Sequence, residues 1–465
     1  MGITLVAVIG ILMVSLLLQK YFKFPSSMWM MLLGYIVHEM AGTAVIMPID
    51  EQAFANFVLA TIPILLMSDM MDMDPLDFKK HGYSLFFVIV IGMIGSLILG
   101  YFAADIVFYG YDLTTGEKVF AFIACFATDP VATIAIFSMF VLPHGLKFIA
   151  EGESLGNDAI AILLAVEFAI PLMVLEFTPM GFTINSIMAL IVILVLGVIM
   201  AYIGLIMMGV KRNNTWDLSA WLMTAGLTFL IAENLYVIPN FLFGTHSHFH
   251  VSGIAVVIVT IMYLLIMTNK IRIKNASIIE KDKMYLENAG MNEKVYSKTA
   301  IHRAMSRLHR NISSDDDHNT IKGQIQFMAL ILNTLLMIYL GGIISEDWDI
   351  IVKYWFPIVL MVIFSTLIRG IMFGAFAWIS NRVERMISIP FHWWVVLTFA
   401  GFQGGLSVVF MTMLPADIAN AELIRAVIIG NIVLSTVVNA VVLLWYITKK
   451  NDTFQAEYEL EHAHH

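Results

Sequence analysis

The sequence is dominated by long apolar segments, each about as long as a helix must be to cross a lipid bilayer. Of its 465 residues, 60% are hydrophobic and only 13% are charged. Water-soluble globular chains carry about 25% charged residues, which they need to cover their surface. This chain has too few charges for that, so the composition predicts an all-α polytopic membrane protein.

Thirteen segments meet the length criterion for a membrane-spanning helix. The first has neither a basic region before it nor a small-residue cleavage site, so we expect a retained span rather than a signal peptide. The predicted spans cover residues 2–19, 25–41, 52–71, 83–109, 117–140, 154–176, 183–209, 216–236, 251–268, 324–344, 353–380, 392–413 and 423–447.

The placement of lysine and arginine predicts how the chain is oriented in the membrane. Basic residues gather in every second connection between the predicted spans and in the C-terminal tail, and the other connections carry almost none. Cytoplasmic loops are the basic ones. We therefore expect the N-terminus outside and the C-terminus in the cytoplasm of a multi-pass cell-membrane protein.

The predicted spans fall into two groups separated by one polar segment. Residues 1–268 hold nine spans, residues 269–323 form a cytoplasmic polar linker, residues 324–447 hold four spans, and residues 448–465 form a cytoplasmic tail. The sequence has no phosphate-binding loop, which argues against ATP-driven transport, and no basic, aromatic-rich stripe that would bind nucleic acid. A single cysteine, Cys125, excludes a disulfide framework.

The fifth predicted span, 117–140, carries a carboxylate directly before a proline. Pro130 removes a backbone donor and breaks the helix at Asp129. Carbonyl groups and helix ends freed by such a break can bind ions beside a cavity in the membrane. A simple proline kink, with Asp129 capping the second half-helix, is the alternative reading.

The sixth predicted span, 154–176, opens with a polar face. Ser154, Asn157 and Asp158 share one side of a helix by their spacing and offer a hydroxyl, an amide and a carboxylate to a hard cation. A buried carboxylate binds either a proton or a monovalent cation, and that competition is the minimal chemistry of an antiporter. The alternative places Asp158 at a helix start near the membrane surface.

A second break is predicted in the span 392–413, where three glycines surround Gln403 in an apolar segment. Close packing of helices through glycine is the competing explanation for this segment alone. Two interrupted spans, one in each half of the chain, indicate an inverted-repeat transporter fold with a site near the middle of the membrane.

These motifs resemble the sodium/proton exchangers of the NhaP and mammalian exchanger type, the first branch of the monovalent cation:proton antiporters. The specific part of the resemblance is Ala-Thr-Asp-Pro-Val at 127–131 together with Glu-Gly-Glu-Ser-Leu at 151–155 and the pair Asn157-Asp158. Weaker matches along the chain are Ala232-Glu233, Ser-Gly-Ile-Ala at 252–255 and Leu-Asn-Thr-Leu-Leu at 332–336.

The resemblance implies about 13 transmembrane helices, a homodimer embedded in lipid, and a core with two crossed, discontinuous helices. It implies an elevator-type exchange of Na⁺ (or Li⁺ or K⁺) for H⁺ without a cofactor or enzyme activity, and electroneutral exchange because position 157 is Asn. The ion-binding residues would be Thr128, Asp129, Ser154 and Asp158, organised by Asn157.

One position departs from the family pattern. The twelfth span of relatives carries Gly-Leu-Arg-Gly, and the arginine pairs with the acid that corresponds to Glu153; here the segment 401–404 reads Gly-Phe-Gln-Gly. Because Gln403 is neutral, we expect Glu153 to lie near Gln403 with no basic side chain in reach, and to be protonated or hydrogen-bonded instead.

Other polar residues receive supporting or no roles. Asp69 could line an entry funnel, and Glu233 is interpreted as a structural residue. Three alternating histidines, His246, His248 and His250, could form a Zn²⁺ site, but we favour a solvated loop. Two other functions stay open at this point: a Na⁺-coupled organic-anion transporter on the same fold, and a non-transporting membrane sensor or channel.

Overall fold

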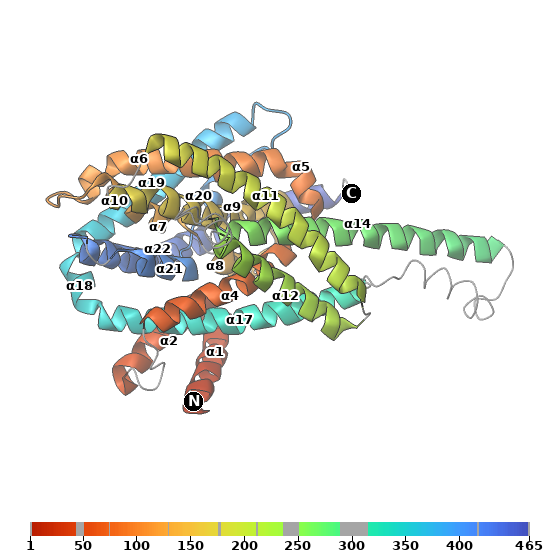
Figure 1. Cartoon of the computed structure of the whole chain (residues 1–465), viewed down its shortest axis with the longest axis horizontal. Coiled ribbons are helices and arrows are strands. Elements are labelled where there is room, and N and C mark those ends of the chain that lie inside the picture. The colour runs from red at the N-terminus through yellow and green to blue at the C-terminus, as the bar shows by residue number, and fades with distance from the viewer. Residues whose placement is uncertain are drawn as a thin grey trace, which may run out of the picture. The chain divides into compact units, whose positions relative to one another are not determined.

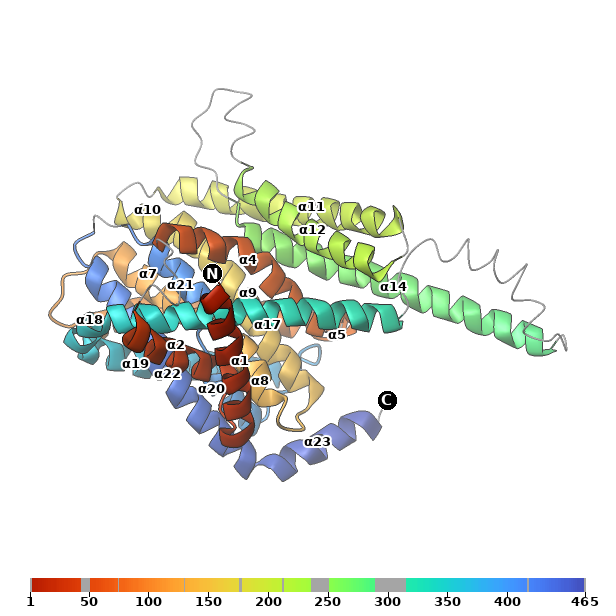
Figure 2. The same ribbon diagram turned by 90° about the horizontal axis from the view of Figure 1, so that it is seen from below.

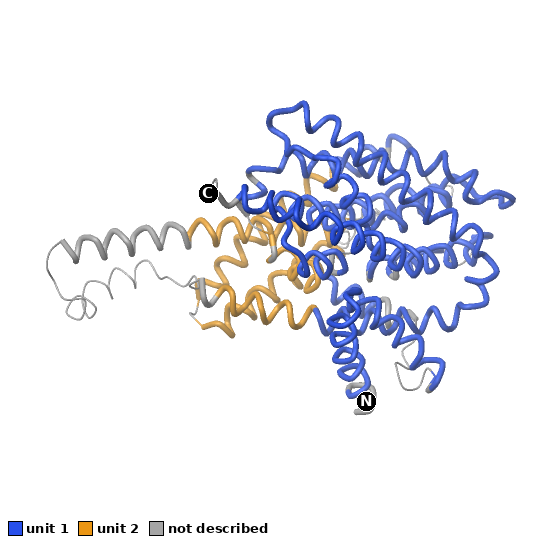
Figure 3. Tube along the Cα trace, turned by 180° about the vertical axis from the view of Figure 1, so that it is seen from behind, with its two compact units in different colours: residues 1–62, 76–187, 330–465 blue, residues 63–75, 188–329 orange. Residues whose placement is uncertain are grey.

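A computed structural model describes residues 2–42, 51–73, 75–128, 130–174, 178–210, 213–235, 251–288, 315–415 and 418–463, and every regular element in them is a helix (Figure 1). The chain forms two compact units, shown in different colours in Figure 3. Unit 1 comprises residues 1–62, 76–187 and 330–465, and unit 2 comprises residues 63–75 and 188–329.

The helices follow one another along the chain with short connections. In order they are α1 (Gly2–Phe22), α2 (Ser26–Ala41), α4 (Glu51–Asp72), α5 (Pro75–Phe86), the π-helical turn η1 (Phe87–Gly92), α6 (Met93–Val107), α7 (Thr115–Phe126), α8 (Pro130–Phe137), α9 (His144–Leu164), the π-helical turn η2 (Ala165–Ala169), α10 (Ile170–Met173), α11 (Pro179–Val210), α12 (Asn214–Glu233), α14 (Gly253–Asn288), α17 (Asp315–Glu346), α18 (Trp348–Lys353), α19 (Trp355–Ser380), α20 (Phe391–Phe399), α21 (Gly405–Met413), α22 (Ala421–Lys449) and α23 (Asn451–Ala463).

The prediction of an all-α polytopic membrane protein is confirmed. Each predicted span overlaps a helix, or a helix that is interrupted, in the described residues. Seven helices there are long and apolar enough to cross a membrane: Lys80–Val107, His144–Met173, Thr183–Val210, Gly253–Ile271, His318–Glu346, Trp355–Ser380 and Ala421–Lys449. Two shorter apolar helices, Val6–Phe22 and Asn56–Met71, accompany them.

The sixth predicted span begins earlier than its apolar run suggests. Helix α9 starts at His144, directly after Pro143, rather than at residue 154. Proline suits a helix start because its missing N–H is not needed there. The polar residues 151–158 therefore lie inside the helix, and the alternative that placed Asp158 at a helix start is wrong.

The predicted polar linker, 269–323, is helical at both described ends. Helix α14 continues to Asn288, and α17 already begins at Asp315. Residues 289–314 lie outside the described residues. The three histidines of the loop, His246, His248 and His250, lie outside them as well.

Within unit 1, helices α2 and α17 approach each other through glycine. A Cβ atom added to Gly341 would lie 2.6 Å from the backbone nitrogen of Tyr35, and one added to Gly34 would lie 2.6 Å from the carbonyl oxygen of Ile338. Small residues let helix backbones approach closely in a membrane, where tight packing is a main source of helix association.

We expect Gly341→Leu to destabilise the protein by about 1–3 kcal/mol, because the new side chain meets backbone atoms that cannot turn aside. The matched control is Gly323→Leu on the same helix, where an added Cβ has nothing within 4 Å. Melting temperatures of the two variants in the same detergent check this. Equal melting temperatures would contradict the close approach.

Candidate ion site

The first predicted break lies between α7 and α8. Helix α7 ends at Phe126, Ala127 is extended with ψ 122°, and α8 begins at Pro130. Proline cannot donate to the preceding turn and disfavours a helical residue before it, so the chain opens here. The break is confirmed. Asp129 lies outside the described residues, and its role stays a prediction.

The polar face of α9 is buried in the interior of unit 1. The exposed fractions are 3% for Glu153, 0% for Ser154, 5% for Asn157 and 8% for Asp158. Carboxylates this deeply buried need compensation by a proton, a cation or hydrogen-bond donors. The face thus concentrates two carboxylates and two neutral polar groups within little more than one helical turn.

The break and the α9 face are in direct contact. The hydroxyl group of Thr128, itself buried, donates a hydrogen bond of 3.1 Å to Oγ of Ser154. The structure thereby brings together two of the oxygen atoms that the sequence proposed as cation ligands. Their separation in sequence, 26 residues, is bridged by the turn between α8 and α9.

The second predicted break is also present. Helix α20 ends at Phe399 and α21 begins at Gly405, with Phe402 and Gln403 buried between them. A helix end leaves carbonyl groups without intrahelical partners, and lipid offers no substitute. Asn439 of α22 meets part of this need by donating to the carbonyl oxygen of Gly401 at 2.8 Å.

The two broken helices cap each other where they meet. The hydroxyl group of Thr133 on α8 donates to the carbonyl oxygen of Ala400 at 2.7 Å. In return, Nε2 of Gln403 donates to the carbonyl oxygen of Cys125 near the end of α7. Each interruption thus satisfies a carbonyl group that the other has left free.

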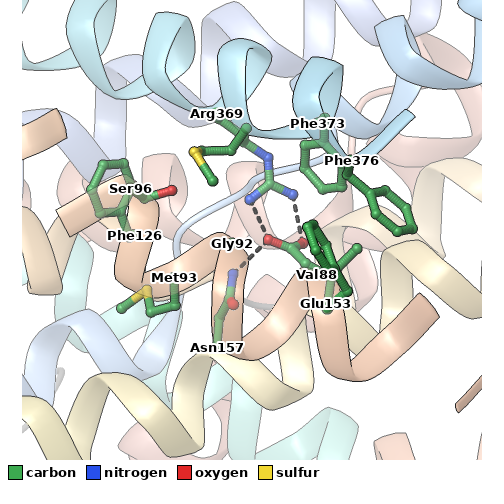
Figure 4. A pocket seen from close by; sticks show the side chains of 12 residues that line it. Val88, Gly92, Met93, Ser96, Phe126, Glu153, Asn157, Arg369, Phe373 and Phe376 are labelled. Carbon is green, nitrogen blue, oxygen red and sulfur yellow. Dashed lines mark hydrogen bonds and ion pairs between the residues drawn. The ribbon is translucent and has the colours of Figure 1, made fainter. Parts of the chain in front are cut away.

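The predicted relationship between Gln403 and Glu153 is wrong. Glu153 forms a two-pronged ion pair with Arg369 of α19, Nη1 donating to Oε1 at 2.7 Å and Nη2 to Oε2 at 2.6 Å (Figure 4). A paired guanidinium keeps the carboxylate charged and compensated. Gln403 is committed to Cys125 instead, so a Gln403→Arg exchange is no longer expected to supply a missing partner.

Arg369 is the functional residue that the sequence interpretation missed. It stands in the apolar predicted span 353–380, where a charged side chain is costly and marks a specific role. The search for intramembrane charge had considered carboxylates only. A lone arginine in that span was the available signal.

Arg369 joins three helices around the site. Its Nε donates to the carbonyl oxygen of Leu397 on α20 at 3.0 Å, and its guanidinium lies 5.0 Å from the ring centre of Phe373. Gly401 leaves room for it, because a Cβ there would lie 2.8 Å from the guanidinium carbon. Asn157 donates its side-chain amide to Glu153, which supports the organising role predicted for this residue.

A cavity of about 430 Å³ adjoins the ion pair (Figure 4). Apart from Ser96, Glu153, Asn157 and Arg369, its lining is apolar and comes from η1, α6, α7 and α19. Apolar surroundings strengthen the attraction between opposite charges and raise the cost of separating them. The cavity wall therefore favours a closed Glu153–Arg369 pair.

Two further acids lie in unit 2. Asp69 is half-buried on α4, and nothing in the structure tests its predicted place in an entry funnel. Glu233, at the end of α12, accepts a hydrogen bond of 2.8 Å from the backbone N–H of Gly253 at the start of α14. This is the structural role that the sequence favoured, since a carboxylate stabilises a helix N-terminus.

An all-α membrane protein in which two broken helices meet beside a buried carboxylate face has the architecture of an ion-coupled transporter rather than that of an enzyme. Residues 5–242 match the family model described as sodium/hydrogen exchanger, transmembrane, and the chain belongs to this family.

Solved structures share the fold. The chain is similar to the sodium proton antiporter MjNhaP1 from Methanocaldococcus jannaschii at pH 8, with a TM-score of 0.67 and 17% identity over 96% of this chain and 99% of that one. An electron-microscopy structure of the same antiporter gives a TM-score of 0.61 and 18% identity over 96% and 95% of the two chains.

We expect Arg369→Leu to destabilise the protein by about 3–5 kcal/mol, because it strands a buried carboxylate. Replacing both partners, with Glu153→Leu added, should recover most of that loss. The control is Lys353→Leu, which removes an ion pair with Glu422 whose side chains are 56% and 50% exposed, and should cost less than about 1 kcal/mol. Thermal unfolding in detergent checks this order. A double variant no more stable than the single one would contradict the pairing.

Proposed function

We propose that this protein is a secondary antiporter that exchanges Na⁺, or Li⁺ or K⁺, for H⁺ across a membrane. The observation that supports the proposal best is the Thr128–Ser154 contact, which places the first helix break against the buried face of α9 that carries Asp158. Membership of the sodium/hydrogen exchanger family and the shared fold point to the same chemistry.

The exchanging group is the carboxylate of Asp158. Hydroxyl oxygens of Ser154 and Thr128, with the carboxylate of Asp129, complete a set of hard oxygen ligands for a small monovalent cation. A buried carboxylate is stable when neutralised either by a proton or by a cation, so binding of one requires release of the other. This competition couples the two fluxes without any further device.

Glu153 stays outside this exchange in the proposed mechanism. Its charge is already compensated by Arg369 through two hydrogen bonds, so it requires neither a proton nor the transported cation. One exchanging carboxylate then carries one proton or one monovalent cation in each half-cycle. The exchange is accordingly electroneutral.

Alternating access follows an elevator-type movement in this proposal. The described site residues, the two broken helices and Arg369 all belong to unit 1, which supports their moving together. We further infer a homodimer in the cell membrane, with the N-terminus outside and the C-terminus in the cytoplasm, from the distribution of basic residues in the connections.

We expect Asp158→Asn to abolish exchange in a folded protein, because asparagine can neither titrate nor neutralise a cation. Ser154→Ala removes a neutral ligand only and should raise the apparent KM for Na⁺ several-fold. The control is Asp105→Asn, which alters a carboxylate paired with Lys118 whose side chain is 72% exposed. Proteoliposomes with an internal pH dye give the rates. Wild-type exchange by Asp158→Asn would exclude this mechanism.

We expect the initial exchange rate to be independent of membrane potential, because one charge moves in each direction. Proteoliposomes clamped with valinomycin at several K⁺ gradients, under a constant pH gradient, measure this. A rate that changes strongly with the clamped potential would show that a second charge moves, and Asp129 would then be the first residue to examine.

A further inference from the structure

The last described helix, α23, packs against the beginnings of two helices of the site. Phe454 of α23 is fully buried and its ring lies 5.3 Å from that of His392 in the first turn of α20. The ring of Tyr458 lies 5.6 Å from that of His144, the first residue of α9. All of these residues belong to unit 1, and Figure 2 shows α23 as the dark blue helix near the C-terminus.

Both of these helices begin without a cap of their own. The N-cap residues are Pro143 before α9 and Pro390 before α20, and neither provides a side-chain hydrogen bond to the first turn. Helix starts normally gain stability from a Ser, Thr, Asp or Asn side chain at this position. Proline has no such acceptor, so another part of the chain must serve the exposed N–H groups.

Helix α23 provides carboxylates at both starts. Oε2 of Glu461 accepts a hydrogen bond of 2.8 Å from the backbone N–H of His144. Glu457 binds two side chains of the first turn of α20: Oε2 accepts from Nε1 of Trp393 at 2.8 Å, and Oε1 lies 2.8 Å from Nε2 of His392. A negative charge is also favoured by the dipole at a helix N-terminus.

The two helix starts are in contact with each other as well. A Cβ atom added to Gly145 of α9 would lie 3.2 Å from Cη2 of Trp393 on α20. The same indole ring that packs on α9 donates its N–H to Glu457. Glycine is therefore needed at position 145 to let α20 come this close, and α23 fixes the contact from outside.

A second link joins the same helices near the ion site. Arg369 binds Glu153 on α9 and the carbonyl oxygen of Leu397 on α20. From His144 to Glu153, α9 rises by about 14 Å, so the two links are well separated along it. Two helices held at two separated points cannot easily slide or tilt relative to each other.

We propose that Glu457 and Glu461 are positioning residues for cation binding. Through His392, Trp393 and the first N–H of α9, they fix the spacing between the helix that carries Asp158 and the broken helix α20–α21. This role rests on the proposed antiport function. It assigns α23 to the transport machinery, with the cation affinity of a distant site as the property it controls.

The test compares Glu457→Ala and Glu461→Ala with the wild-type chain in proteoliposomes over a range of Na⁺ concentrations. Each loses a charge-assisted hydrogen bond, and we expect the apparent KM for Na⁺ to rise about three- to tenfold while the maximal rate changes less than about twofold. Glu457→Gln keeps a neutral hydrogen bond and should restore part of the affinity. The control is Glu459→Ala on the exposed side of α23, which should match the wild type.

A merely structural role of α23 would lower the maximal rate and the melting temperature and leave the KM unchanged, and that result would overturn the proposal. If a variant folds poorly, Glu457→Gln alone decides by the same KM criterion. If the wild-type chain exchanges no cation, the proposed function fails instead. Hydrogen–deuterium exchange then tests the link: Glu457→Ala should expose the starts of both α9 and α20, and unchanged protection at either start would refute it.

Discussion

A helix that is interrupted inside a bilayer leaves carbonyl groups that no water can reach, and this constraint shapes the centre of the protein. Thr133 and Gln403 each donate to a carbonyl group of the other broken helix, and Asn439 donates to a third. Unpaired, each such group would cost several kcal/mol in hydrocarbon. Either break alone would lack these partners, so the two interruptions stabilise each other, and α9 and Arg369 pack around the point where they meet.

Arg369 turns that meeting point into a chemically selective one. By holding Glu153 and a carbonyl group of α20 at once, it connects the carboxylate face of α9 to the second broken helix. It also divides the two buried carboxylates of α9 by function, since Glu153 is compensated within the protein and Asp158 is the group proposed to exchange its ligands. The apolar cavity beside the pair keeps this division stable by making separation of the charges costly.

Much of the fold could be predicted from the sequence because lipid imposes simple demands on length and composition. The two breaks were evident from Pro130 and from the glycines around Gln403, and the polar face of α9 from the spacing of Ser154 and Asp158. The start of α9 was misplaced because its first turns are too polar to be recognised as a span. The partner of Glu153 was missed because spatial neighbours 216 residues apart leave no local pattern.

The chemical nature of the caps at the crossing has a further consequence. The groups that the structure describes there are a hydroxyl and two carboxamides, none of which gains or loses a proton over the physiological range. A lysine or arginine in the same place would add a fixed positive potential beside the cation. With Gln403, the crossing is electrically quiet: acidity and ionic strength leave its hydrogen bonds intact, and the carboxylates alone report the proton concentration to the transport cycle.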